Sequence, residues 1–196
     1  MAVKHLVENV RDIALVGHRA AGKTSLADAL LFDAHAVDRL GSVDDGTSVA
    51  DSDDEEHRHH FSIDTHVLHA DHDGKHLNIL DAPGSPDFIG AALEALAAVE
   101  TAVIVVSAVN GVEPVTRKMF AEATALGLAR AIVINKLDAE NVDLPELVAN
   151  IQSAFGKNCV LFNMPDRTGP GMREVHCLLD PRQIFSPSSP VDANAA

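Results

Sequence analysis

The chain has 196 residues, 46% of them hydrophobic and 22% charged, which is typical of a soluble globular protein with one domain. Its 29 acidic residues outnumber 15 basic ones, and the resulting net charge of -14 argues against direct binding of nucleic acid, which needs clustered lysine and arginine. The longest apolar stretch, near residues 102–109, is too short to span a bilayer, and the N-terminus has no signal-peptide core. We therefore expect a cytoplasmic monomer with no membrane partner.

Apolar runs, alternation and helical spacing predict an alternating series of strands and helices. In chain order the elements are a strand over 13–16, a helix over 23–35, strands over 61–68 and 75–80, a helix over 86–99, a strand over 102–107, a helix over 115–126, a strand over 131–134 and a helix over 144–155. An Asp-Gly pair at 73–74 predicts a hairpin between the second and third strands. The expected fold class is α/β, a mostly parallel sheet with one antiparallel edge strand and helices on both faces.

A glycine-rich loop lies between the first strand and the first helix. Its residues 17–24 fit the pattern G-x-x-x-x-G-K-[ST], the P-loop, whose backbone N–H groups and helix N-terminus hold phosphate. Lys23 is expected to reach the terminal phosphates and Thr24 to coordinate Mg²⁺. The alternative, an ordinary glycine-rich turn, is disfavoured by the strand-helix context. The nucleotide-binding residues predicted here are Gly17, His18, Arg19, Ala20, Ala21, Gly22, Lys23, Thr24 and Ser25.

A second motif, Asp-Ala-Pro-Gly, ends the returning strand of the hairpin. Asp81 is placed to hold Mg²⁺ through a water, and the Gly84 N–H to meet a γ-phosphate. Alone, such a string is also an ordinary turn, but it follows a P-loop here. The predicted contacts of this motif with the nucleotide come from Asp81, Ala82, Pro83, Gly84 and Ser85.

A third motif, Asn-Lys-Leu-Asp, follows a buried strand. The Asp138 carboxylate can accept two hydrogen bonds from guanine, at N1–H and the 2-amino group, and adenine lacks this donor pair. Asn135 and the Lys136 stem are expected to support the base and the loop. Without its context the string would be a surface loop. The residues predicted to contact the base are Asn135, Lys136, Leu137 and Asp138.

The three motifs, in this order and spacing, resemble a translational GTPase. The finer match, carried by Asp-Ala-Pro-Gly-Ser-Pro-Asp-Phe at 81–88 and Ser-Ala-Val-Asn-Gly-Val-Glu at 107–113, is to elongation factor G and its paralogues. The segment from 46 to 63 resembles the family's first switch. The resemblance covers about residues 10 to 180 and implies a switch driven by GTP and GDP with Mg²⁺, acting on the ribosome.

The family's first switch supplies a Thr or Ser to the Mg²⁺ in the GTP state, and Ser62 occupies that point. The expected metal residues are therefore Thr24, Ser62 and Asp81, with a strand hydroxyl that has no metal role as an equal alternative for Ser62. The family usually has a histidine after Asp-Ala-Pro-Gly, where this chain has Ser85. The residues expected to take part in catalysis are Ser85, Gly84 and His18. A serine hydroxyl positions the attacking water less well than a histidine, which puts fast hydrolysis in doubt.

The resemblance also divides the chain. We expect a P-loop GTPase domain over 1–157, the start of a truncated insert over 158–185, and a disordered tail over 186–196. The family's later Ser-Ala motif is not present, so the chain is expected to be a fragment or a shortened form. A binding module that does not hydrolyse GTP is the alternative function, and the third motif argues against a P-loop ATPase or kinase.

Seven of the eleven histidines lie between His57 and His76. A metal site at His57-x-His59-His60 is conceivable, but solvated histidines are the favoured interpretation. His66 and His76 are expected on facing strands as possible neighbours. The acidic run over 51–56 is expected to be a solvated face of the first switch.

Overall fold

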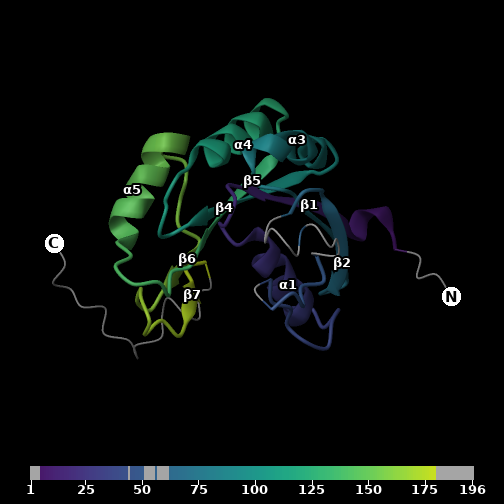
Figure 1. Ribbon diagram of the computed structural model, residues 1–196, viewed down its shortest axis with the longest axis horizontal. Helices are drawn as coiled ribbons and strands as arrows, with labels where there is room; N and C mark the ends of the chain where they lie inside the picture. The colour runs from purple at the N-terminus through teal and green to yellow at the C-terminus, as the bar shows by residue number, and fades with distance from the viewer. Residues whose placement is uncertain (1–4, 44, 51–55, 57–61, 180–196) are drawn as a thin grey trace. The chain divides into compact units, whose positions relative to one another are not determined.

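A computed structural model describes residues 5–43, 45–50, 56 and 62–179, drawn in colour in Figure 1. The chain divides into two compact units, one up to Lys136 and one from Leu137 onward. Each unit is described by itself. The predicted domain boundaries at 157 and 185 remain predictions, and both His57-x-His59-His60 and the tail over 186–196 lie outside the described residues.

The first unit is built on a five-stranded sheet with the order β2-β3-β1-β4-β5. Strands β1, β3, β4 and β5 run parallel, and β2 pairs antiparallel with β3 at the edge. The fold class predicted from the sequence is therefore confirmed. The elements are η1 (Val7–Asn9), β1 (Val10–Gly17), α1 (Lys23–Asp33), β2 (His66–His72), β3 (Lys75–Asp81), η2 (Pro86–Phe88), α3 (Ile89–Ala97), β4 (Thr101–Ser107), α4 (Pro114–Ala125) and β5 (Ala129–Asn135).

One face of the sheet packs against α1 (Figure 1). The apolar side chains of α1 meet alternate residues of β1, β2 and β3, as expected for strands whose side chains point to opposite faces. This packing holds the N-terminus of α1 at the carboxyl end of β1, where the glycine-rich loop lies. The buried cluster consists of Leu15, Ala27, Leu31, Ala50, Leu68, Ala70 and Ile79.

The opposite face is covered by α3 and α4 (Figure 1). Ala14 and Ala102 are paired in register on this face and are fully buried, as are their neighbours Val16 and Ile104. The alanines present little volume, so a helix backbone can approach the sheet closely. Burial on both faces explains why β1 and β4 read as continuous apolar runs.

Two elements differ from the sequence-based expectation. The edge strand begins at His66, and residues 62–65 do not belong to it, because the backbone N–H groups of Ile63 and Asp64 donate to the Glu56 side chain instead of to a neighbouring strand; residue 61 lies outside the described residues. The helix expected over 86–99 is divided into η2 and α3. Pro86 lies at the start of η2, where its missing N–H costs nothing.

The expectation for His66 and His76 as neighbours across strands is wrong. In the observed register His66 faces Asp81, and His76 faces Asp71. The reason is the hairpin turn, which is confined to Asp73 and Gly74 with both residues at positive φ, so that β2 continues through His72.

The second unit contains α5 (Leu144–Phe155) and a short hairpin of β6 (Asn163–Pro165) and β7 (Val175–Cys177). Helix α5 has the predicted bounds. Asp143 caps it by accepting a hydrogen bond of 2.9 Å from the Glu146 N–H. The hairpin was not predicted, because strands of three residues carry too little alternation to be recognised.

Within the described part of the chain, no helix has the length and apolar character needed to cross a membrane.

Candidate functional site

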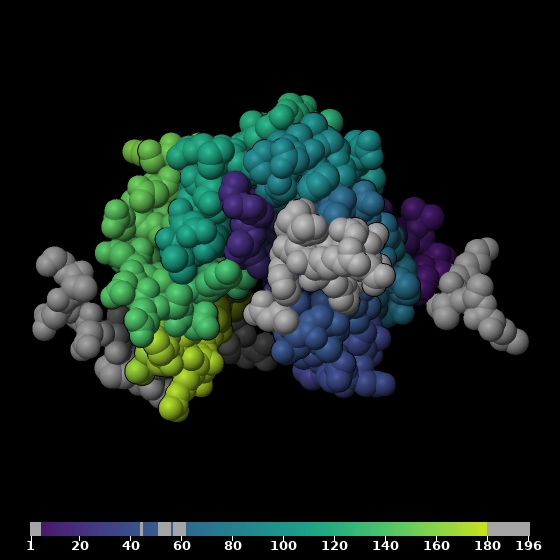
Figure 2. All heavy atoms as spheres, in the orientation of Figure 1, coloured from purple at the N-terminus to yellow at the C-terminus, as the bar shows by residue number. Residues whose placement is uncertain are grey.

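The glycine-rich loop joins the carboxyl end of β1 to the N-terminus of α1. Figure 2 shows this loop, in dark purple, at the surface of the first unit. Gly22 immediately precedes α1 with φ of 90°, and a Cβ at this position would lie 2.2 Å from Asn135 Nδ2. Only glycine fits there, because both the backbone conformation and the space exclude a side chain. The result is a helix N-terminus whose first N–H groups are directed at the loop.

Lys23 lies in the loop with only 7% of its surface exposed. Its Nζ donates a hydrogen bond of 3.1 Å to the His18 carbonyl. Burial lowers the pKa of Lys23, and the negative charges of Asp81 and Glu113 oppose that shift. A bound phosphate would supply further negative charge and complete the neutralisation of this ammonium group.

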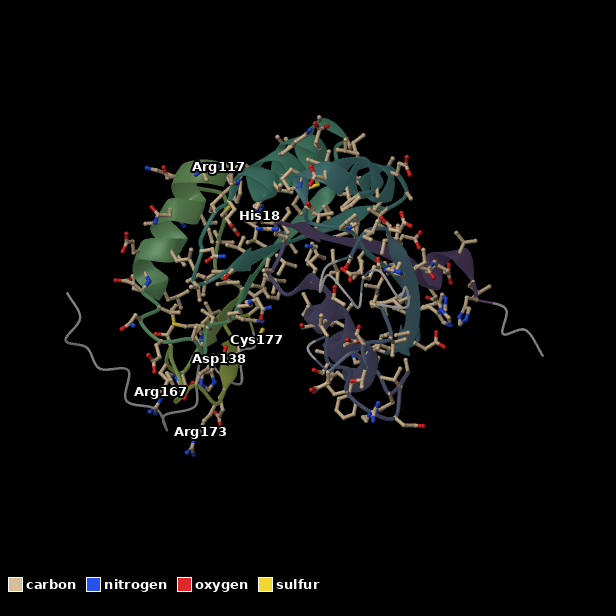
Figure 3. The ribbon with its side chains drawn as sticks, viewed as in Figure 1. His18, Arg117, Asp138, Arg167, Arg173 and Cys177 are labelled. Carbon is tan, nitrogen blue, oxygen red and sulfur yellow. The ribbon has the colours of Figure 1, made fainter. Side chains whose placement is uncertain are left out.

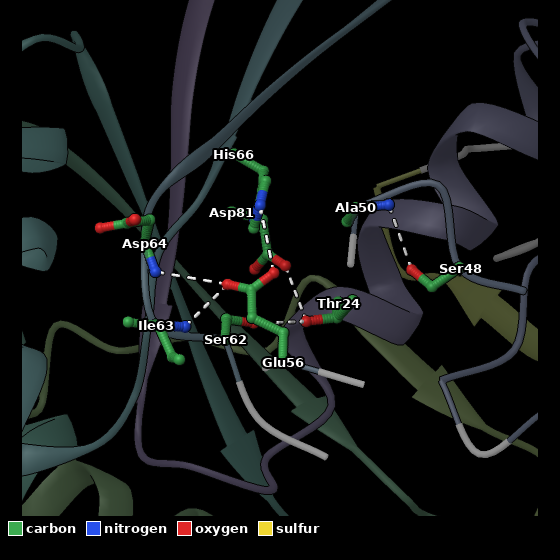
Figure 4. A network of polar contacts seen from close by, with 9 residues as sticks. All are labelled: Thr24, Ser48, Ala50, Glu56, Ser62, Ile63, Asp64, His66 and Asp81. Atoms are coloured by element: carbon green, nitrogen blue, oxygen red, sulfur yellow. Dashed lines mark hydrogen bonds and ion pairs between the residues drawn. The ribbon is translucent and has the colours of Figure 1, made fainter. Parts of the chain in front are cut away.

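The three side chains expected to hold a metal meet at the start of α1 (Figure 4). Thr24 Oγ1 donates a hydrogen bond of 2.7 Å to Asp81 Oδ2 and lies 3.3 Å from Ser62 Oγ. All three supply oxygen, which Mg²⁺ prefers, and neighbouring ligands at about 2.0–2.1 Å from an octahedral Mg²⁺ lie about 2.9 Å apart. The donor set and spacing therefore fit this ion.

The second motif lies directly against the glycine-rich loop. The Arg19 N–H donates a hydrogen bond of 3.0 Å to the Gly84 carbonyl. A Cβ on Gly84 would lie 2.4 Å from Lys23 Nζ and 2.6 Å from the Arg19 nitrogen. Residues 81–85 are all buried, so this contact depends on glycine at position 84. Ser85 is 9% exposed and precedes η2.

His18 is held in place by an acidic side chain from the loop after β4. Its Nε2 lies 3.3 Å from Glu113 Oε1, and the His18 Nδ1 is buried with no hydrogen-bond partner among the described residues. His18 is labelled in Figure 3. A carboxylate beside an imidazole fixes the orientation of the ring. Glu113 ends the family-like string over 107–113, but its contact with His18 could not be read from the sequence.

Asn135 ties the end of β5 to the glycine-rich loop. Its Nδ2 donates a hydrogen bond of 3.0 Å to the Ala21 carbonyl, and its Oδ1 accepts one of 2.9 Å from the Lys136 N–H. Lys136 has φ of 62°, the left-handed region that turns the chain sharply after the strand. The third motif therefore touches the first one through its asparagine.

Asp138 belongs to the second unit and is described within it. The residue is exposed and lies in a turn (Figure 3). The Gly169 N–H donates a hydrogen bond of 2.8 Å to the Leu137 carbonyl, so the loop around Gly169 supports this turn. The roles of Asp138 and Leu137 toward a base remain predictions.

Two buried carboxylates that the sequence did not single out accept hydrogen bonds from the segment that is predicted to be the first switch. Glu56 is 1% exposed and accepts hydrogen bonds of 2.8 Å from Ile63 N–H and 3.3 Å from Asp64 N–H. Asp28 of α1 is also 1% exposed, and its Oδ1 accepts a hydrogen bond of 3.1 Å from the Val49 N–H. At Glu56 the expectation of a solvated acidic face is wrong, because the side chain is buried and its Oε1 accepts from backbone donors; residues 51–55 lie outside the described part of the chain. An acidic run in the sequence offers no signal that distinguishes its buried member.

Comparison with known proteins identifies the family. The model of the elongation factor Tu GTP binding domain matches residues 8–185. An elongation factor G-like protein of Mycobacterium tuberculosis (strain CDC 1551 / Oshkosh) is 37% identical over 160 residues, covering 82% of this chain and 22% of the relative. Peptide chain release factor 3 of Ligilactobacillus salivarius is 32% identical over 180 residues, covering 90% of this chain and 34% of that protein.

A solved structure agrees with this assignment. The crystal structure of ttk003000868 from Thermus thermophilus superposes with a TM-score of 0.80 at 35% identity, over 84% of this chain and 25% of that one. The chain thus spans about a fifth to a third of the length of these relatives. The match of the family model over nearly the whole chain, the loop and switch geometry and the shared fold together establish that the chain belongs to the GTP-binding domains of elongation factor Tu type, the translational GTPases.

Proposed function

We propose that the chain is a GTP-driven switch domain that binds the nucleotide with Mg²⁺ and hydrolyses GTP slowly or on stimulation by the ribosome. The observation that carries the proposal is the contact of Thr24 with both Asp81 and Ser62, at 2.7 and 3.3 Å. It joins the glycine-rich loop, the second motif and the first switch at one point. A ligand held there is sensed by both switch segments at once.

The residues have separate tasks in this proposal. The loop N–H groups and Lys23 bind the phosphates. Thr24, Ser62 and Asp81 hold Mg²⁺, which when bound neutralises charge on the phosphates. The Arg19 N–H now donates to the Gly84 carbonyl, so a γ-phosphate that uses this N–H must displace that carbonyl. The second motif would then rearrange with the presence of γ-phosphate.

Asp138 selects guanine in this proposal, and calorimetry tests it first. GDP and ADP, each with Mg²⁺, are titrated into the chain and into Asp138→Asn. We expect binding of GDP and not of ADP by the original chain, and a lower ratio of GDP to ADP affinity in the variant. An unchanged ratio would contradict the role of Asp138, and binding of neither nucleotide would contradict the switch itself.

Hydrolysis rests on His18, Gly84 and Ser85. A serine hydroxyl reaches less far than an imidazole, so the water-positioning group after Gly84 is weaker than in the family pattern. The contact between His18 and Glu113, at 3.3 Å, favours an oriented imidazole as a substitute, on a residue whose backbone lies against Gly84. Single-turnover phosphate release, with and without ribosomes, tests this. Stimulated release that falls in His18→Ala supports hydrolysis through His18.

The second candidate function is a nucleotide-binding or ribosome-binding module that does not hydrolyse GTP. Ser85 at the position after Gly84 favours it. The relatives are named as an elongation factor G-like protein and a peptide chain release factor, so the ribosome is the proposed partner and the cytoplasm the proposed location in both cases. Phosphate release that ribosomes do not change, together with retained GTP binding, would select this second function.

A further inference from the structure

A cluster of histidines and one aspartate lies at the edge of the first unit, where β1 begins and the β2–β3 hairpin turns. It consists of His5, Asp71 and His76, whose possible ligand atoms all lie within 4.8 Å of one another. His76 is paired in register with Val10 at the start of β1, whereas the glycine-rich loop follows the end of that strand. The cluster is therefore separate from the nucleotide site.

The two histidine side chains converge on one carboxylate oxygen of Asp71. Asp71 Oδ1 lies 2.8 Å from His76 Nδ1 and 3.9 Å from His5 Nδ1. The two imidazoles stack with 4.0 Å between their centroids. The His5 and His76 side chains are only 28% and 19% exposed, so the structure holds these rings against each other.

The backbone that carries His5 is tied to the hairpin independently of this cluster. Lys75 Nζ donates a hydrogen bond of 2.7 Å to Asn9 Oδ1 at the end of η1. The Asn9 N–H in turn donates a hydrogen bond of 2.9 Å to the Leu6 carbonyl. His5 therefore approaches the hairpin on a segment that is already anchored, and less ordering entropy is lost when a ligand joins the two.

From this arrangement we propose that His5, Asp71 and His76 form a binding site for a divalent transition-metal ion, Zn²⁺ in the first place, which joins the N-terminal segment to the β2–β3 hairpin. Two imidazole nitrogens and one carboxylate oxygen are ligands that Zn²⁺ accepts, with a water at the fourth position of the tetrahedron. Mg²⁺ is not expected here, since it prefers oxygen ligands alone.

The two distances to Asp71 Oδ1 require only small movements of side chains. Ligand atoms at about 2.0–2.1 Å from a tetrahedral Zn²⁺ lie about 3.3–3.4 Å apart. The pair Asp71–His76, at 2.8 Å, must open by about half an ångström, and the pair Asp71–His5, at 3.9 Å, must close by a similar amount. Both changes are within reach of side-chain torsions. The net charge of -14 also favours the approach of a cation.

Cobalt is a visible probe for such a site. The full chain, treated with EDTA and dialysed, is titrated with Co²⁺ and then with Zn²⁺. We expect absorption bands of tetrahedral Co²⁺ with one equivalent bound, and their loss when Zn²⁺ displaces it. Zn²⁺ at a hundred times its Kd should raise Tm by roughly 5–10 °C and leave the affinity for GDP unchanged.

Substitutions locate the ion. His5→Ala and His76→Ala should each weaken Co²⁺ binding by at least about tenfold. His72→Ala, on the same strand but on the opposite face from Asp71, is the matched control and should bind as the original chain does. A triple variant, His57→Ala with His59→Ala and His60→Ala, should also keep its binding.

Circular dichroism shows whether each variant is folded before it is titrated. Absence of tetrahedral Co²⁺ bands in the folded original chain overturns the proposal. So does unchanged binding in folded His76→Ala, or binding lost in the triple variant and kept in His76→Ala. Guanine-nucleotide binding is measured on the same samples, so failure of the metal site is distinguished from failure of the proposed switch.

Discussion

The carboxylate of Glu56 lies against the ring of His66, with 3.3 Å between Glu56 Oε2 and His66 Nε2 (Figure 4). Oε1 of the same carboxylate accepts hydrogen bonds from the Ile63 and Asp64 N–H groups. One buried side chain therefore joins the first switch to the start of β2. Ser62, which reaches Thr24, precedes these two donors directly, so Glu56 determines where Ser62 lies.

Replacing Glu56 should destabilise the first unit. Glu56→Ala removes the acceptor of two backbone N–H groups and the partner of His66, and we expect a loss of about 2–4 kcal/mol in the free energy of unfolding. Glu56→Gln keeps an acceptor oxygen and should lose less. Urea unfolding monitored by circular dichroism measures both variants.

The control for this prediction is Asp64→Ala. Asp64 is exposed, and its N–H, which donates to Glu56, survives the substitution. Its effect should stay within about 0.5 kcal/mol. Equal effects of Glu56→Ala and Asp64→Ala would mean that Glu56 does not anchor the switch in solution.

Asp28 should control the opening of the segment over 41–50. Its Oδ1 accepts from the Val49 N–H, and a Cβ on Gly41 would lie 2.8 Å from its carboxyl group, so the loop returns to α1 at both of its ends. Asp28→Ala removes this anchor. We expect limited proteolysis within 41–50 to become several-fold faster, because the cleaved state is reached by local opening.

Asp33→Ala, at the exposed end of the same helix, is the matched variant and should be cleaved at the original rate. Amide exchange in β1 and β3 should be the same in both variants. A general acceleration of exchange in Asp28→Ala would instead indicate that Asp28 stabilises the whole unit. It would contradict a specific role of Asp28 in anchoring the segment over 41–50.

The strands and helices could be predicted because each buries an apolar face with a clear period. The runs at 13–16 and 102–107 correspond to β1 and β4, which are covered on both faces, and Pro145 with the spacing over 144–155 marks α5 correctly. The alternation predicted a strand wrongly over 62–65. There the Glu56 carboxylate takes the backbone donors, and a side chain distant in the pattern decides the outcome.

The site shows the same division. The glycine-rich loop and the Asp-Ala-Pro-Gly turn could be recognised because their chemistry is local to a few residues. Asp28, Glu56 and Glu113 could not be recognised, because each acts through a contact with residues outside its own local pattern. Acidic side chains are common in this sequence, and only the fold distinguishes those that are buried.

Because of Lys23, GDP binding at alkaline pH should be coupled to the uptake of a proton. In the folded protein without nucleotide, burial lowers the pKa of Lys23 below the ordinary lysine value of 10.5. Between the lowered value and 10.5, the unfolded chain therefore holds more protons than the folded one. Stability without nucleotide should therefore rise with pH in that window. Phosphate favours the charged ammonium group, so GDP binding there should be accompanied by uptake of a proton.

Calorimetry in two buffers with different ionisation enthalpies measures this uptake. We expect the uptake to increase as the pH rises through the lowered pKa of Lys23 toward the ordinary lysine value. Lys118→Ala, which removes an exposed lysine of α4 outside the three motifs, is the control and should leave the uptake unchanged. Proton release on binding, or uptake that does not vary with pH, would contradict a buried, desolvated Lys23.

Gly84→Ala should separate the second motif from the glycine-rich loop. The added Cβ would approach the Arg19 nitrogen and the His18 carbonyl carbon to 2.6 Å, and these are backbone atoms that cannot move aside as a flexible side chain could. We expect a loss of about 1–3 kcal/mol in the free energy of unfolding. The Arg19 amide, which donates to the Gly84 carbonyl, should also exchange faster.

Gly90→Ala provides the contrast, because a Cβ there meets nothing within 4 Å and the position lies in α3. That substitution should stabilise the protein by up to about 1 kcal/mol, since alanine is the better helix former. Urea unfolding compares the two variants, and hydrogen exchange follows Arg19. If Gly84→Ala were as stable as the original chain with a protected Arg19 amide, the second motif could not rest on the loop as described, and its displacement by a γ-phosphate would lose its basis.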